Sequence, residues 1–202
     1  METYPSIFRF DSRCYGTSLC VVPDVSMQAI RNNDWDINGP RYINKYLISG
    51  EYPSWLEFPV VFHPLPGRPG KKLRDVMDMT SPPCYLISER LKDILTSNDV
   101  TGWKTYPVRV FDNKNIESPG YYGFSVTGRG GKVDYKNDDW IHWTPQDKLY
   151  DIRQWDGNDI FTLDNGASIW MTERVYRLLK KEKVTALEDW PAEKLMTVID
   201  HD

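Results

Sequence analysis

The sequence has few cysteines and no long apolar run. Its 202 residues include three cysteines, Cys14, Cys20 and Cys84, which form neither a CxxC pair nor a disulfide ladder. Reduced thiols are typical of the cytoplasm, so we expect a cytoplasmic protein. No apolar run approaches the roughly 18 residues that span a bilayer, and no basic segment followed by an apolar stretch opens the chain. We therefore expect neither a membrane partner nor a secretory signal.

The sequence also has no excess of positive charge. The 25 lysines and arginines are outnumbered by 29 aspartates and glutamates, for a net charge of -4. This balance argues against a protein that binds nucleic acid through bulk charge, so we expect no nucleic-acid partner. Aromatic residues are abundant instead, with 8 Trp and 12 Tyr. Apolar residues make up 40% and charged residues 27%, which is typical of a globular chain.

Histidine is scarce, and no catalytic set is recognisable around it. His63 lies between an apolar segment and a proline-rich loop, which is typical of a structural hydrogen bond. His142 follows Asp138 and Asp139, and a neighbouring carboxylate can raise the pKa of an imidazole into the useful range. No Ser or Cys nucleophile stands at a recognisable spacing. We expect no enzyme, and a small hydrolase using His63 or His142 is the alternative.

No metal-binding spacing is present either. Asp156, Asp159 and Asp164 are three and five residues apart, whereas a calcium loop needs carboxylates at alternate positions and a closing Glu. Tight turns explain these aspartates better. The cysteines at 14 and 20 have no histidine pair to complete a zinc site. We expect no metal and no cofactor.

A proline- and glycine-rich loop at residues 64–70 is the best candidate boundary. Before it, residues 55–62 are expected to form a strand, which Pro59 would confine to a sheet edge. After it, Gly128–Gly131 is expected to be the turn of a hairpin between residues 121–126 and 132–135. The expected parts are an N-terminal segment (1–63) and an α+β domain (64–202).

One segment occurs twice, 84 residues apart. Residues 85–91, YLISERL, align with residues 169–175, IWMTERV, and the offset stays constant as far as Pro107 and Pro191. Each copy predicts a strand, a helix of about three turns and an extended exit. We therefore expect homologous strand–helix–strand units over 85–111 and 169–192, with the apolar helix positions 91, 94 and 95 equivalent to 175, 178 and 179.

The start of each repeated helix has the same chemistry. A hydroxyl is expected to accept a free backbone amide, and a Glu in the first turn suits the positive end of the helix dipole. An Arg in the first turn opposes that dipole, so each Arg needs a specific carboxylate or carbonyl partner. The residues are Ser88, Glu89 and Arg90 in the first copy and Thr172, Glu173 and Arg174 in the second.

Short connections between the later strands favour antiparallel pairing. The fold class we expect is α+β, a mostly antiparallel sheet with the two homologous units and a smaller N-terminal segment.

The ordered segments 86–95, 100–103, 121–124 and 169–174 resemble the predicted immunity proteins of bacterial polymorphic toxin systems. The resemblance is to the group with an α+β fold and a repeated Ser-Glu-Arg-Leu helix start, and it covers about residues 60–195. It implies a cytoplasmic protein whose partner is a cognate toxin, which it binds and neutralises.

A tryptophan-rich acidic stretch lies between the repeats. Indole rings carry much of the binding energy of protein interfaces, and carboxylates around them attract a basic partner. Two other interpretations stay open: the rings fill the core, or they stack on sugars in a glycan-binding module. The expected toxin contact face consists of Asp138, Asp139, Trp140, Trp143 and Trp155.

Overall fold

The computed structural model describes residues 4–12, 16–68, 70–79, 84–136, 144–164 and 168–199. Within these ranges the helices are α1 (Asp24–Arg31), α2 (Asn44–Ser49), α3 (Glu89–Ser97) and α4 (Glu173–Lys181), with short 3-10 turns η1 (Pro40–Tyr42), η2 (Pro145–Asp147), η3 (Ile152–Gln154) and η4 (Ala192–Lys194). The strands are β1 (Ile7–Ser12), β2 (Val21–Pro23), β3 (Val60–Pro64), β4 (Val76–Met79), β5 (Cys84–Ser88), β6 (Trp103–Val110), β7 (Tyr121–Val126), β8 (Gly128–Arg129), β9 (Val133–Tyr135), β10 (Lys148–Asp151), β11 (Ile160–Thr162), β12 (Ile169–Thr172), β13 (Leu187–Pro191) and β14 (Thr197–Ile199).

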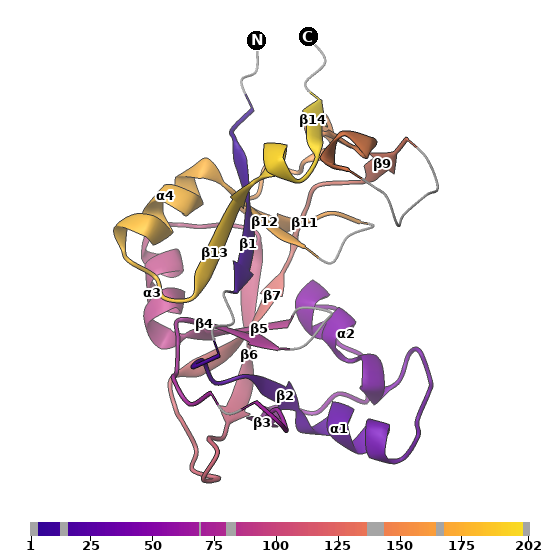
Figure 1. Cartoon of the computed structure of the whole chain (residues 1–202), viewed down its shortest axis with the longest axis vertical. Coiled ribbons are helices and arrows are strands. Elements are labelled where there is room, and N and C mark those ends of the chain that lie inside the picture. The colour runs from indigo at the N-terminus through magenta and orange to yellow at the C-terminus, as the bar shows by residue number, and fades with distance from the viewer. Residues whose placement is uncertain are drawn as a thin grey trace.

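Over the described residues, these strands form two large sheets and a small one (Figure 1). One large sheet has the order β2-β3-β6-β7-β5-β4, the other β13-β1-β12-β11-β8, and the small sheet β14-β10-β9. Most neighbouring strands are antiparallel; the parallel pairs are β3 with β6, β11 with β8, and β10 with β14. The expected α+β fold is confirmed, but the strands of the described residues form three sheets rather than the single, mostly antiparallel sheet that was expected.

The internal repeat is also confirmed. Helix α4 begins and ends 84 residues after α3, and β5 and β12 lead into the two helices. Leu91 and Leu95 of α3 are buried in the same core as Val175 and Leu179 of α4. Even unusual backbone conformations recur, because φ is positive at Asp99 and again 84 residues later. The equivalent helix faces therefore bury equivalent residues.

The repeat extends further in space than along the sequence. Val76 of β4 pairs with Ile87 of β5, and residues 84 positions later pair in the same way in β11 and β12. The next strand, however, comes from different parts of the chain: β7 lies beside β5, but β1 lies beside β12. The first unit therefore has the order β4-β5-β7-β6, and the second has β11-β12-β1-β13.

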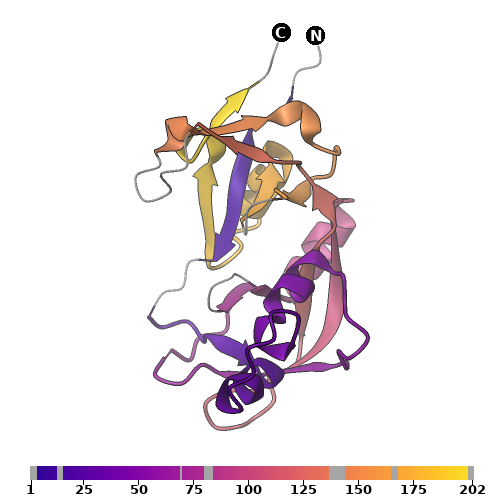
Figure 2. The ribbon, with the colours of Figure 1, turned by 90° about the vertical axis from the view of Figure 1, so that its right-hand side faces the viewer.

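Among the described residues, three apolar cores hold these layers together. The central core combines α3 and α4 with residues of both large sheets. On the outer face of the six-stranded sheet, α1 and α2 help to enclose a second core. Figure 2 shows both helices in front of the lower strands. On the outer face of the five-stranded sheet, the small sheet and its neighbouring turns enclose a third core.

The expected hairpin around Gly128–Gly131 is wrong. Strand β7 pairs with β5 and β6, whereas β9 pairs with β10, and the glycine segment itself forms β8 beside β11. An added Cβ at Gly128 would overlap the carbonyl oxygen of Ile160. The glycine therefore serves the close approach of two backbones rather than a turn.

The strand expected at residues 55–62 begins later than predicted. Strand β3 starts at Val60, after Pro59, and it is an inner strand between β2 and β6 rather than an edge. Because Pro59 precedes the strand, its missing N–H leaves the ladder intact. The division of the chain at residue 63 stays a prediction; β1 lies in the five-stranded sheet, and β2 and β3 lie in the six-stranded one.

Candidate functional site

Most of the contact face expected from the sequence lies outside the described residues. This holds for Asp138, Asp139, Trp140 and Trp143, and also for His142.

Trp155 is described, and it is half-buried. Its indole Nε1 donates a hydrogen bond to the carbonyl of Asn158 at 2.7 Å, and its ring packs 6.0 Å from that of Phe161, beside the third core. These contacts fix the Trp155 ring against its own fold. The proposed contact face as a whole stays a prediction.

The first repeated helix start forms a clasp centred on Asp75. Its carboxylate accepts hydrogen bonds from the Ser88 hydroxyl at 2.7 Å and from Arg90 Nη1 at 2.8 Å. It also accepts from the backbone N–H and the hydroxyl of Thr185, at 2.8 and 2.9 Å. Arg90 additionally donates to the carbonyl of Glu182, at the end of α4. The cation in the first turn thus has the carboxylate and carbonyl partners that its position requires.

A second clasp, centred on Asp159, repeats the first with the two units exchanged. The Asp159 carboxylate accepts from Arg174, from the Thr172 hydroxyl at 3.1 Å, and from the backbone N–H of Thr101 at 3.0 Å. Arg174 Nη1 donates to the carbonyl of Asn98, at the end of α3. Each unit therefore supplies an aspartate that binds the threonine following the other unit's helix.

The two caps differ in one respect. Ser88 accepts the N–H of Leu91 at 3.1 Å, as expected, whereas Thr172 makes no side-chain cap bond. The expected cap at Thr172 is wrong: its hydroxyl donates to Asp159, as the Ser88 hydroxyl donates to Asp75, but it accepts no backbone N–H of its helix.

Both clasp aspartates are held in the ionised form. Burial alone would raise the pKa of Asp75, but hydrogen bonds from Thr185 and Ser88 outweigh it and hold that pKa below its ordinary value. Burial likewise opposes ionisation of Asp159, and hydrogen bonds from Arg174 and Thr101 lower its pKa. The repeated motif thus joins the two units to each other.

The ring of His63 packs against an aromatic neighbour. It lies on β3, and its ring stacks on Phe111 with 5.0 Å between centroids and 10° between planes. Within the described part of the chain, no ion pair joins it to a carboxylate. The structure therefore does not bring His63 into a catalytic arrangement with described acidic residues.

Asp156 closes a turn, as expected. Its carboxylate accepts the N–H of Arg129 at 2.7 Å and that of Asn158 at 3.0 Å. Among the residues that the structure describes, no group of three His, Cys, Asp or Glu side chains is placed to hold a metal ion. Among the described helices, none combines the length and the apolar character needed to span a bilayer.

A groove of about 410 Å³ lies between α1 and the segment that leads into β3; we call it the α1 groove. Three carboxylates line it, from Asp24, Asp34 and Glu57, together with the ring of Trp55. Its described lining contains no lysine or arginine. The α1 groove therefore combines an aromatic wall with negative charge, which suits a basic partner.

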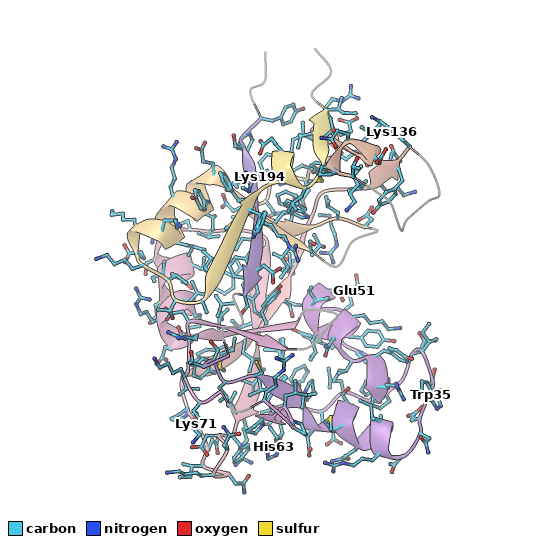
Figure 3. The ribbon with its side chains drawn as sticks, in the orientation of Figure 1. Trp35, Glu51, His63, Lys71, Lys136 and Lys194 are labelled. Carbon is cyan, nitrogen blue, oxygen red and sulfur yellow. The ribbon has the colours of Figure 1, made fainter. Side chains whose placement is uncertain are left out.

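Large apolar side chains are exposed beside the groove. Trp35 is 65% exposed and Ile37 is 68% exposed, both in the turn between α1 and η1. Figure 3 shows Trp35 at the outer edge of the molecule. The guanidinium of Arg41 lies 3.6 Å from the centre of its ring, and Lys45 donates to the Ile37 carbonyl at 2.6 Å. These contacts hold the exposed turn in one arrangement before a partner arrives.

The contact face expected from the sequence does not include this turn. Its sequence signal is the run Asp34-Trp35-Asp36, which has the same aromatic and acidic character as the stretch between the repeats. The groove itself could not be seen, because α1 and the segment before β3 are far apart along the chain.

Comparison with protein families gives one match. The model of the immunity protein family Imm11 matches residues 19–188, a span that includes the α1 groove and both clasps. The chain belongs to the Imm11 immunity protein family. A comparison with curated protein sequences finds no match. Membership of Imm11 indicates toxin neutralisation in general, and proteins of immunity families typically act without catalysis.

Proposed function

We propose that this Imm11 protein neutralises one cognate toxin in the cytoplasm by binding it directly, without catalysis. The α1 groove and its exposed neighbours Trp35 and Ile37 form the contact surface. The observation that carries this proposal is the groove lining, which has three carboxylates, a tryptophan ring and no basic side chain among its described residues.

The chemistry of the groove lining favours a toxin with a basic, partly apolar face. Carboxylates at the rim speed the encounter with such a face, and a large aromatic ring supplies most of the affinity once water is displaced. Because Arg41 and Lys45 already hold the exposed turn, little side-chain freedom is lost on binding.

The experiment first identifies a toxin domain encoded beside this gene and then uses that domain with a substitution that abolishes its activity. Binding is measured by calorimetry, and protection is measured as growth of cells that express the active domain. Trp35→Ala should weaken binding by about thirtyfold, corresponding to about 2 kcal/mol. Asp34→Ala should weaken it less at high salt than at low salt, because rim charges act mainly through long-range attraction.

Matched controls lie elsewhere on the surface. Trp190→Ala removes an exposed tryptophan of β13, and Asp134→Ala removes an exposed carboxylate of β9; both should bind normally. The paired change Asp139→Ala with Trp140→Ala tests the face expected from the sequence. If only that pair lowers affinity, the α1 groove is not the contact surface. If the wild-type protein neither binds nor protects, direct neutralisation of this toxin is refuted.

A further inference from the structure

A second cavity lies in the other half of the molecule, against the third core. It has a volume of about 140 Å³, close to the size that holds a benzene ring. Strands β1 and β12 form one wall, β9 and β10 another, and residues after η4 close it. The residues that line it are Arg9, Val133, Tyr135, Lys148, Leu163, Ser168, Trp170, Leu195 and Met196.

Two residues that line this cavity carry a buried N–H donor without an acceptor among the described residues. Trp170 is only 4% exposed, and within the described part of the chain its indole Nε1 has no hydrogen-bond partner; the same holds for the buried Nε of Arg9. The two residues lie directly opposite each other in the pairing of β1 with β12. Asp11 binds Arg9 through Nη2 at 2.5 Å, which fixes the guanidinium but leaves Nε unpaired. A buried donor without an acceptor is costly, so two at one cavity call for an explanation.

The rest of the lining defines the missing acceptor. Lys148 adds a second cation, Ser168 adds a hydroxyl, and the described lining contains no carboxylate. Val133, Leu163 and Met196, all buried, supply apolar walls. Because Asp11 already pairs with Arg9, Lys148 is the cation that favours a negatively charged ligand, and the two N–H donors call for acceptor oxygens beside a compact apolar group. A carboxylate with a short branched or aromatic body has all three properties.

We propose that this cavity binds a monocarboxylate with a compact apolar group. Its oxygens accept hydrogen bonds from Arg9 Nε and Trp170 Nε1, Lys148 neutralises its charge, and its apolar group packs on Leu163 and Met196. A free organic acid and the C-terminus of a polypeptide ending in an apolar residue share this chemistry. The inference does not depend on toxin binding, because it rests on different residues.

The experiment follows the indole N–H signal of Trp170 by ¹⁵N NMR, with no toxin present. The signal is assigned by its loss in Trp170→Phe. The wild-type protein is titrated with 4-methylpentanoate and with acetyl-Gly-Gly-Leu bearing a free carboxylate, and in parallel with the amide of each. We expect a saturable shift at about millimolar concentration for a carboxylate and none for its amide. A response to 4-methylpentanoate alone identifies a free organic acid as the ligand, and tighter binding of the peptide identifies the C-terminus of a polypeptide. Either result supports the proposal.

Lys148→Met should weaken carboxylate binding by at least about fivefold. Its matched control is Lys194→Met, since Lys194 lies on η4 in the same half of the molecule but does not line the cavity (Figure 3). The proposal is overturned if neither carboxylate shifts the Trp170 signal of the wild-type protein, if the amides shift it equally, or if both lysine variants lose the same affinity. These measurements do not test the proposed toxin contact, so the two proposals can fail independently.

Discussion

Replacing Asp75 with alanine removes the centre of one clasp between the two repeated units. The Asp75 side chain is only 10% exposed and accepts hydrogen bonds from Ser88, Arg90 and Thr185. Removing one partner of a buried ion pair costs about 3–5 kcal/mol, because the remaining charge and donors lose their acceptor. We expect about 3 kcal/mol, since the Arg90 side chain is 49% exposed and water can replace part of its interaction. For a chain of this size, that loss lowers the Tm by about 6–12 °C.

The assay is urea unfolding of the wild-type protein and of Asp75→Ala, followed by fluorescence and circular dichroism. Asp134→Ala, which removes an exposed carboxylate of β9, should change the free energy of unfolding by no more than about 0.5 kcal/mol. A double-mutant cycle with Thr185→Val isolates the contact between units, and we expect a coupling of about 1 kcal/mol. A loss below about 1 kcal/mol for Asp75→Ala, or a coupling of zero, would refute the role assigned to this clasp.

Three further outcomes are expected. The pKa values of Asp75 and Asp159 are lowered in the folded protein, so both groups contribute stability that is present above the unfolded Asp pKa and is lost as the pH falls through the folded pKa values. Between pH 7 and about pH 3, the wild-type protein should therefore lose more stability than the Asp75→Ala, Asp159→Ala double variant. Urea unfolding at both pH values measures this difference. Gly102→Ala should cost about 3 kcal/mol in thermal unfolding, because φ is positive there and the added Cβ would overlap the Ile160 carbonyl. Phe10→Ala should cost about 3–5 kcal/mol and match Phe124→Ala within about 1 kcal/mol, because both rings are buried at equivalent strand positions in the central core; a much smaller loss for Phe10→Ala would contradict that equivalence.

The sequence predicts the repeated helices well because their signals are local. A strand, a hydroxyl, a Glu and a spaced apolar face all fall within about a dozen residues. The dipole that Arg90 and Arg174 oppose predicts that each needs a carboxylate or carbonyl partner, but it does not identify that partner. The cap at Thr172 was mispredicted although Thr172 repeats the donor role of Ser88. Its hydroxyl donates to Asp159, 13 residues earlier in the chain, as the Ser88 hydroxyl donates to Asp75, but only Ser88 also accepts a backbone N–H of its helix. Whether the hydroxyl meets that N–H depends on its orientation in the folded protein, which no local pattern contains.

The glycine segment and the α1 groove were missed for the same physical reason. Glycine suits a tight turn and the close approach of two backbones equally well, and only the position of Ile160 distinguishes them at Gly128. The groove forms where α1 meets the segment around Trp55 and Glu57. These two parts are separated by about two dozen residues along the chain, and only the fold brings them together. Composition showed that aromatic and acidic residues were available for an interface, but their assembly required the tertiary structure.

Strand β1 explains why the repeat looks incomplete along the chain. The 84-residue offset stops at β13 because the strand equivalent to β7 precedes the first unit instead of following the second. The equivalence holds in detail: Phe8 of β1 stacks on Tyr176 of α4 at 4.0 Å, and Tyr122 of β7 lies 3.9 Å from the Lys92 ammonium of α3, one repeat earlier. The two units are thus the same arrangement of four strands and a helix, threaded in a different order. Strand β1 is an inner strand of the second unit, so packing around the Asp159 clasp depends on it. This strand lies outside the sequence repeat and before the part matched to Imm11.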